Sequence, residues 1–586
     1  MQTTDATRLE GAASREPASG DAGAAELRAR RARFTWAAAG SIVVVTAVLW
    51  VQGLLRNDGH FLYVFDDTAI HMSIVRQLLH HGTWGVSSGH YASASSSPGW
   101  TLLLAAFTGA LPFAANALPL ILNLAAAGWL VWLFAAHQEF LLPRKRDWLT
   151  VVAIFVMTVV LWFGPGLAVV GMEHMLHAAL VVQLLVLLRQ LQRREITVRS
   201  SRLLLCVLFV ATLVRYESAF LAVGVACALL AGTTRQLGSA DSLAHWTRGR
   251  AARLGVWALA VGAIPIVAFG IVNKAFGESF LPNSIEAKSN LQYESGIRIL
   301  RGPVKLWPII TSDWAVTALA LLIVAYLVVA FRGTKRDSVG IAIAWLVTAL
   351  LHVQFASFGW YSRYEAYLLI AGSYVLLCIA SEVVRPSWRT GVLLLAIVLI
   401  PVLSIGRIHN TLDAPLASSN TYRQRYQMAQ FLKRYYNHKG FLTGELGYST
   451  LLHDGDVVDV LGLGTHDVIA QRKAHGAELS AAFVEHLAAE HHVAVAAVYG
   501  LSPSFVVPRS WVLVGEWDLQ EHRVSVPDPA LQFYATSQAG VAQLDHDLHA
   551  FSSRLPSHVK VLYRPDLAAR YARLGAAWRK AHRQHH

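Results

Sequence analysis

Long apolar runs recur through the first 405 residues of this chain, and they constrain its fold more than any other feature. A helix of about 20 apolar residues crosses the hydrocarbon core of a bilayer and satisfies its backbone hydrogen bonds internally. The residues are 54% hydrophobic and only 15% charged, which excludes an ordinary soluble globular protein. The sequence therefore predicts a mainly α, polytopic membrane bundle over residues 34–405.

Apolar length and loop charge together indicate about eleven spans. They are Phe34–Leu55, Ala115–His137, Trp148–Pro165, Gly171–Leu188, Leu203–Arg215, Ser218–Gly232, Leu254–Phe276, Trp314–Phe331, Val339–Ala356, Ala366–Ser381 and Gly391–Ile405. Trp100–Leu111 is also apolar but shorter. A crossing there would turn the basic residues 144–146 outward, so we expect a helix lying in the outer interface.

Basic residues lie in the short loops between these runs, as at Arg144–Arg146 and Arg332–Arg336. Cytoplasmic loops carry such an excess, so the net charge of +13 indicates topology and not nucleic-acid binding. The arginines at 28, 30, 31 and 33 place residues 1–33 in the cytoplasm, where we expect them to be disordered. An odd number of spans then places residues 406–586 outside the cytoplasm, and we predict a multi-pass membrane protein.

Residues 406–586 mix polar and apolar residues and predict an extracytoplasmic α/β domain. Strand-like runs are Val457–Leu461, Val493–Val498, Trp511–Val514 and Val559–Tyr563, and helical runs are Tyr422–Tyr436, Leu479–Glu490 and Pro565–Lys580. This domain is rich in histidine, at His486, His491, His492, His582, His585 and His586. Their spacing favours surface histidines over a zinc site. The three cysteines, Cys206, Cys227 and Cys378, lie in apolar runs and predict neither disulfides nor metal ligation.

An acidic pair, Asp66 and Asp67, follows the first span in an outer loop predicted at residues 56–99. Apolar residues at three- and four-residue steps predict an amphipathic helix from Thr68. One interpretation is that Asp67 caps this helix while Asp66 is solvated. The other is functional, because Asp66 directly follows the apolar run Phe61–Phe65 and would sit at membrane level, where a carboxylate is costly.

Further polar residues are predicted at the same outer level of the membrane. They are Glu173, Arg215, Glu217, Asn283, Lys288, Arg363, Tyr364 and Glu365, together with Arg76 on the helix after the acidic pair. Each could be an interfacial anchor. Together they place acids and bases on one side only, which indicates a site that holds an anionic head group and a base near the outer leaflet.

Several short stretches resemble the GT-C glycosyltransferases, in that family's order and over roughly residues 60–465. They are Asp66-Asp67 with Arg76, Ser96-Ser97-Pro98-Gly99-Trp100, Gly171-Met172-Glu173, Arg215-Tyr216-Glu217, Leu281-Pro282-Asn283 with Ala287-Lys288, Arg363-Tyr364-Glu365, and Gly444-Glu445-Leu446-Gly447 with Val458–Leu463. The chain most resembles the branch of the terminal arabinofuranosyltransferases. It departs from that branch at Tyr216, where the family usually has proline.

The resemblance implies an inverting transfer of a sugar from a polyprenyl-phosphate donor to an acceptor hydroxyl of a glycan, lipid or protein, in cell-envelope assembly at a bacterial plasma (inner) membrane. It implies that Asp66, beside Asp67, is the catalytic base. A single displacement requires such a base to take the proton of the acceptor hydroxyl. Arg76, Lys288 and Arg363 are the candidates to bind the leaving phosphate. The remaining polar residues at that level, Glu173, Arg215, Glu217, Asn283, Tyr364 and Glu365, are candidates for binding substrate.

The two adjacent carboxylates also leave open the binding of a divalent cation, Mg²⁺ or Mn²⁺. The sequence shows no third ligand that would specify such a metal site. Two other functions stay open at this point. A transporter or flippase of lipid-linked sugars would show inverted repeats and broken helices near the bilayer midplane. A structural membrane protein would not need Asp66, Glu173 and Lys288 at one level.

Overall fold

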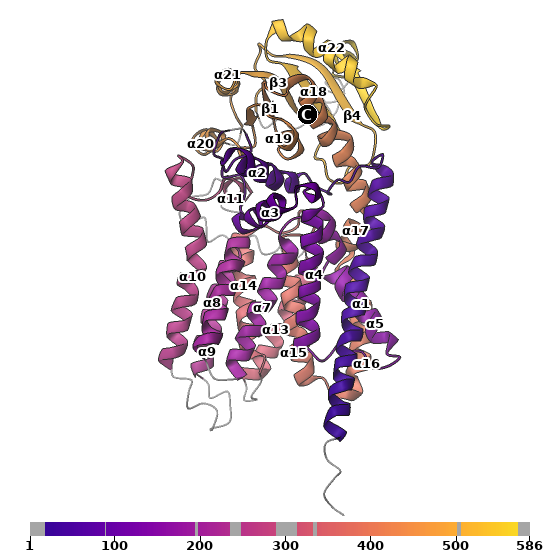
Figure 1. Ribbon diagram of the computed structural model, residues 1–586, viewed down its shortest axis with the longest axis vertical. Coiled ribbons are helices and arrows are strands. Elements are labelled where there is room, and N and C mark those ends of the chain that lie inside the picture. The colour runs from indigo at the N-terminus through magenta and orange to yellow at the C-terminus, as the bar shows by residue number, and fades with distance from the viewer. Residues whose placement is uncertain are drawn as a thin grey trace, which may run out of the picture.

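The computed structural model describes residues 18–87, 89–193, 197–234, 248–288, 313–331, 337–476, 478–500 and 505–571. Helices of the first three quarters of the chain run side by side as a bundle, and the C-terminal quarter forms a sheet domain on one end of it (Figure 1). The predicted mainly α, polytopic bundle with a C-terminal α/β domain is confirmed.

All eleven predicted spans fall on helices of the bundle. These are α1 (Ala18–Arg56), α4 (Leu118–His137), α5, η2 and α6 (Trp148–Phe155, Val156–Leu161 and Gly164–Val170), α7 (His174–Arg193), α8 (Val198–Val214), α9 (Ser218–Thr234), α10 (Arg248–Ala275), α13 (Trp314–Phe331), α14 (Val339–Phe355), α15 (Ala366–Val383) and α16 (Arg389–Leu403). Eight segments among the described residues are long and apolar enough to cross a membrane by themselves. The other three, α8, α9 and α14, have 17 residues each.

The prediction that residues 1–33 are disordered is wrong from residue 18 onward, because α1 begins at Ala18. Arginines in its first half fix this end of the helix to the last turn of α4 and to the loop that follows it. Arg30 Nη2 donates to the carbonyl of Leu142 at 2.8 Å, and Arg31 Nη2 donates to that of Ala136 at 3.0 Å. The arginines that indicated topology therefore also have a structural role.

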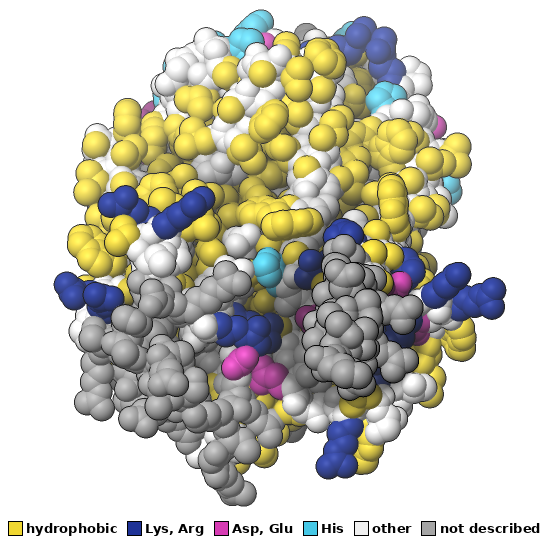
Figure 2. Space-filling model, turned by 60° about the horizontal axis from the view of Figure 1, so that its bottom comes forward, with side chains coloured by type: hydrophobic (Ala, Val, Ile, Leu, Met, Phe, Trp, Pro, Cys, Tyr) yellow, Lys and Arg dark blue, Asp and Glu magenta, His cyan; other side chains and the backbone are white. Residues whose placement is uncertain are grey.

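The start of α1 and the sheet domain lie at opposite ends of the bundle (Figure 1). Figure 2 shows the end away from the sheet, where Lys and Arg side chains gather below sides that are largely hydrophobic. Arg144, Lys145 and Arg146 are exposed in the loop between α4 and α5. The two ends of the described chain therefore lie at opposite ends of the bundle, as an odd number of spans requires.

Three short helices lie between the bundle and the sheet: α2 (Asp67–His81), α3 (Pro98–Ala110) and α11 (Asn283–Lys288). Helix α3 lies across the end of the bundle (Figure 1), as expected for an interfacial helix, and its Trp100 is buried. A longer path, α17 (Ile405–Asn420), η5 (Thr421–Tyr426) and α18 (Gln427–Tyr436), leads from the bundle into the sheet domain.

The sheet has six strands in the order β2-β1-β3-β5-β4-β6. They are β1 (Gly440–Thr443), β2 (Val457–Asp459), β3 (Val493–Tyr499), β4 (Val512–Leu519), β5 (Ala530–Ala535) and β6 (Val559–Tyr563), with helices α19 (Tyr448–Leu452), α20 (His466–His475), α21 (Ala481–Glu490) and α22 (Val541–Ser552). Strand β1 is parallel to β2 and β3, and the remaining pairs are antiparallel. The sequence identified four strands and missed β1 and β5.

Helix α2 shares a hydrophobic core with the sheet domain. Ile70 and Ile74 of α2 belong to one buried cluster with Phe431, Phe441 and Trp517 of the C-terminal region. Burial of such side chains stabilises this contact by about 1.5–3 kcal/mol each. The acidic pair is therefore held between the bundle and the sheet.

Candidate active site

The acidic pair opens helix α2, and neither carboxylate has the role of a helix cap. Asp66 occupies the cap position but makes no side-chain cap hydrogen bond, and Asp67 is the first helical residue. Asp66 is buried, with 6% of its surface exposed. The interpretation of Asp67 as a cap and Asp66 as a solvated residue is therefore wrong.

The Asp66 carboxylate faces the C-terminal domain. Arg425 Nη1 lies 3.4 Å from Asp66 Oδ1, and Arg425 Nη2 lies 3.0 Å from Glu445. Burial raises the pKa of Asp66 well above its usual range; Arg425 opposes this, while Glu445 and Asp67 add to it. A carboxyl group with a raised pKa is a stronger base once it is ionised.

Gly447, in the loop before α19, packs directly on Asp66. A Cβ on this glycine would lie 2.5 Å from the Asp66 carbonyl oxygen, and its φ of +95° favours glycine. The outer domain thus sets the position of the Asp66 backbone.

Asp67 turns toward the bundle and binds Arg363, with Arg363 Nη2 at 2.8 Å from Asp67 Oδ2. The Arg363 guanidinium lies over the rings of Phe65 and Tyr364, at 5.3 and 5.2 Å from their centroids. Such cation–π contacts and the buried ion pair hold the guanidinium in one orientation.

Arg215 is the second buried guanidinium at this level. Its Nη1 lies 2.5 Å from Glu173, and its Nε donates to Glu217 at 3.1 Å. Burial alone would raise the pKa of Glu217, but the charge and hydrogen bonds of Arg215 outweigh it and lower the pKa to about 2. Glu217 therefore stays ionised, and the two carboxylates together fix Arg215.

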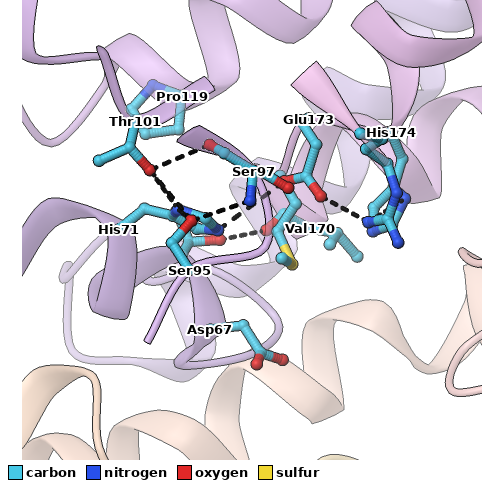
Figure 3. A network of polar contacts seen from close by, with 12 residues as sticks. Asp67, His71, Ser95, Ser97, Thr101, Pro119, Val170, Glu173 and His174 are labelled. Carbon is cyan, nitrogen blue, oxygen red and sulfur yellow. Dashed lines mark hydrogen bonds and ion pairs between the residues drawn. The ribbon is translucent and has the colours of Figure 1, made fainter. Parts of the chain in front are cut away.

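A polar network lies beside these groups (Figure 3). His71 Nδ1 is 2.9 Å from the Thr101 hydroxyl and 3.3 Å from that of Ser95, and its Nε2 is 3.8 Å from Glu173. His71 lies one helical turn after Asp67, whose carboxylate points away from this network in Figure 3.

Two cavities meet at the acidic pair. The inner cavity, about 340 Å³, has the polar wall residues Asp67, His71, Arg215, Tyr216, Glu217, Ser284, Arg363 and Tyr364, and its apolar wall includes Phe220, Ile266 and Phe355. The outer cavity, about 570 Å³, lies against the sheet domain, with Phe65, Asp66, Asp67, Phe358, Trp360, Tyr364, Arg425, Glu445, Tyr499, Phe505 and Asp528 in its wall. Asp67 and Tyr364 line both, so the two cavities share a wall.

Buried polar atoms of the inner cavity lack a partner. Among the described residues, the Nε of Arg363, the hydroxyl of Tyr216 and the Oγ of Ser284 accept or donate no hydrogen bond. Buried polar groups are nearly always satisfied. These atoms leave hydrogen-bonding capacity in the wall of the inner cavity for a polar ligand.

Arg76 does not join the predicted site. Its guanidinium binds Asp454 at 3.1 Å and donates to the carbonyls of Thr450 and His453. It lines neither cavity, because its ion pair with Asp454 and its hydrogen bonds to these carbonyls hold it elsewhere on the C-terminal domain. A role for Arg76 in binding the donor phosphate is therefore withdrawn.

Three other predicted residues support the site from behind. Glu173 is fully buried against Arg215, Glu365 accepts from Arg407 at 3.2 Å, and Asn283 donates to Glu278 at 2.9 Å. None of the three lines either cavity. The Lys288 side chain lies outside the described residues.

The sequence missed Arg425, Glu445 and His71. Arg425 and Glu445 come from the C-terminal domain, more than 350 residues after Asp66, so no local spacing connects them. The stretch at Glu445 did carry the family resemblance, and His71 stands four residues after Asp67, on the same helix face.

The acidic pair does not fit a divalent cation, because arginines occupy its carboxylates. Among the described residues, no three His, Cys, Asp or Glu side chains gather closely enough to hold a metal ion. His491, one of the histidines in the C-terminal domain, is paired with Asp456 at 2.5 Å.

Comparisons with known proteins find a family that matches part of the chain and solved structures that are similar to most of it. The family described as "Domain of unknown function (DUF8728)" matches residues 416–534. The structure of ArnT from Cupriavidus metallidurans bound to undecaprenyl phosphate is similar with a TM-score of 0.46 and 14% identity, over 86% of this chain and 99% of that one. The Archaeoglobus fulgidus oligosaccharyltransferase in its apo form has a TM-score of 0.44 and 11% identity, over 78% of this chain and 69% of that one. No curated protein sequence matches the chain.

Proposed function

We propose that this protein is an inverting GT-C glycosyltransferase that moves a sugar from a polyprenyl phosphate to an acceptor hydroxyl. One observation carries the proposal: Asp66 and Asp67 stand where a cavity containing two fixed guanidinium groups meets a cavity containing carboxylates. On the strength of the family resemblance we propose that the reaction occurs at the outer face of a bacterial plasma membrane, in cell-envelope glycan assembly, and arabinofuranose is the sugar to test first.

The inner cavity suits the donor. Arg215 and Arg363 offer N–H groups to phosphate oxygens, and Tyr216 and Ser284 add hydroxyls. Its apolar wall comes from bundle helices, with Phe220 on α9, Ile266 on α10 and Phe355 on α14. A polyprenyl chain can therefore lie against apolar side chains while its phosphate reaches the arginines.

The reaction is a single displacement. Asp66 takes the proton of an acceptor hydroxyl in the outer cavity, and the oxygen attacks the anomeric carbon. The bond between that carbon and the phosphate oxygen breaks, and the lipid phosphate leaves with the electron pair. Arg215 and Arg363 stabilise the developing charge, so the leaving group needs no proton. One displacement inverts the anomeric configuration.

Product formation from defined donors tests this function. Purified protein in nanodiscs is given undecaprenyl-phosphate sugars, arabinofuranose among them, with membrane glycan as acceptor, and release of undecaprenyl phosphate is measured. We expect Asp66→Asn to lower transfer by about 10²–10⁴-fold, because the amide cannot accept the proton. Asp67→Asn should lower it less, since Asp67 acts by holding Arg363.

The same preparation separates a transferase from a flippase. A flippase in liposomes would move the labelled lipid between leaflets and leave the sugar–phosphate bond intact. Full transfer by both Asp66→Asn and Asp67→Asn would show that the acidic pair is not the catalytic centre.

A further inference from the structure

We infer that the outer cavity binds a neutral or basic sugar of the acceptor, stacked on Trp360, and rejects acidic glycans. This inference rests on the proposed function and names the class of its acceptor. It depends on the charges, the aromatic side chains and the backbone of the outer cavity.

Carboxylates outnumber cations in the wall of this cavity. Asp66, Asp67, Glu445 and Asp528 line it together with one arginine, Arg425, and a second arginine, Arg363, pairs with Asp67 from the inner cavity. Arg425 already pairs with Asp66 and Glu445, at 3.4 and 3.0 Å. A uronate or a phosphate would enter a negative field with low dielectric walls, and like charges there repel strongly. Carboxylate oxygens accept well from sugar hydroxyls and from protonated amines.

Polar and aromatic groups in the cavity suit a sugar. Arg425 is buried, and its Nε makes no hydrogen bond among the described residues, so it can donate to a sugar oxygen. Trp360 is 54% exposed and stacks on Phe65, with ring centroids 5.9 Å apart and an angle of 25° between the planes. The C–H groups of one sugar face carry partial positive charge, and they pack on the negative face of such a ring.

The backbone presents Trp360 at a conformational cost. Trp360, Tyr361 and Ser362 have φ values of 43°, 66° and 57°, a left-handed turn of three residues that have a Cβ. Such residues rarely adopt this conformation, and it is retained where surrounding contacts fix it. Here the Tyr361 hydroxyl donates to the Asn410 carbonyl, and the Ser362 hydroxyl accepts from Asn410 Nδ2 at 3.1 Å.

This turn also couples the acceptor to the donor. Arg363, which lines the inner cavity, directly follows the turn that carries Trp360. One strained segment thus places a ring in the outer cavity and a guanidinium in the inner one.

Binding to a glycan array tests the inference. Protein in nanodiscs is applied to neutral, amino-bearing, and uronate- or phosphate-bearing oligosaccharides. We expect binding to the neutral or basic glycans and none to the acidic ones. Trp360→Ala should weaken that binding by tenfold or more, and Trp360→Phe should restore part of it. Trp388→Ala, which removes an exposed tryptophan at the other end of the bundle, should change nothing.

Binding of acidic glycans, equal binding by Trp360→Ala, or no binding above empty nanodiscs would each overturn the inference. Binding of undecaprenyl phosphate alone is measured on the same variants. Wild-type protein that binds this lipid but no acceptor glycan would overturn the acceptor assignment and leave the proposed transferase standing, so the two failures are distinguishable.

Discussion

The protonation state of Asp66 determines when this residue can act as a base. Because burial and its acidic neighbours raise its pKa, the proton leaves only at a pH above the usual range for aspartate. We expect kcat/KM for transfer to rise with pH through this raised pKa. Glu445→Gln removes a negative neighbour and should lower the pKa, so the acid limb should move to lower pH. An acid limb that stays in place, or moves to higher pH, would contradict this assignment.

Arg363 is expected to depend on its planar guanidinium and not on charge alone. Lysine at this position cannot bind Asp67, cover two rings and reach a phosphate at once. Arg363→Lys should lower donor kcat/KM by roughly 10–100-fold, the loss expected for a charged hydrogen bond.

Arg389→Lys is the matched control for that change. Arg389 also pairs with an aspartate, Asp147 at 3.2 Å, and lies 6.0 Å from the centroid of Phe140, at the far end of the bundle. Equal losses in the two variants would mean that Arg363 acts only through stability.

At the scale of single residues, the sequence predicted which groups are costly to bury but not their partners. Asp66, Arg215 and Arg363 stood out because a charged side chain at membrane depth is costly and is usually retained for a function. Their pairing depends on long-range contacts, such as Asp67 with Arg363, and spacing along the chain does not contain these. Arg76 looked equivalent from the sequence because it shares α2 with the acidic pair.

Among the elements, α2 depends on its attachment to the C-terminal domain. Arg76→Ala removes a half-exposed ion pair with Asp454 and hydrogen bonds to two carbonyls. We expect a loss of about 1 kcal/mol in stability, seen as a lower melting temperature, with the donor KM unchanged. A raised donor KM in the folded variant would return Arg76 to the donor site.

The loop before α19 should control activity through its contact with Asp66. Gly447→Ala introduces a Cβ at 2.5 Å from the Asp66 carbonyl and should displace the base. A shift of about 1 Å in a catalytic group can cost roughly 10²-fold in rate. Gly476→Ala is the control, because its φ of +101° is equally strained but nothing lies within 4 Å. Similar activities of the two variants would contradict this contact-based role.

The helices of the bundle were predicted more completely than the strands of the sheet domain, for a physical reason. Each span needs a long apolar run, and this requirement is visible in the sequence at every helix of the bundle. Strands β1 and β5 have four and six residues, and their burial is decided by neighbours on the sheet, so a short local pattern does not identify them.

For the whole molecule, we predict that the sheet domain lies outside the cytoplasm. Ser553 and Lys145 are exposed at opposite ends of the protein. In a variant without the three native cysteines, Ser553→Cys should react with a membrane-impermeant maleimide in intact cells. Lys145→Cys should react only after lysis. The reverse pattern would invert the topology and place the acidic pair on the cytoplasmic side.

The contact of Asp66 with Arg425, Glu445 and Gly447 has a consequence for biosynthesis. A ribosome adds about 5–20 residues per second, so Asp66 reaches the membrane tens of seconds before its partners are translated. Late in that interval, once Arg363 has been translated, the nascent chain holds both arginines of the inner cavity but still lacks Arg425, Glu445 and Gly447. Under the proposed function, the unfinished protein therefore cannot consume a lipid-linked sugar, and we expect transfer to begin only when the last quarter of the chain has folded onto the bundle.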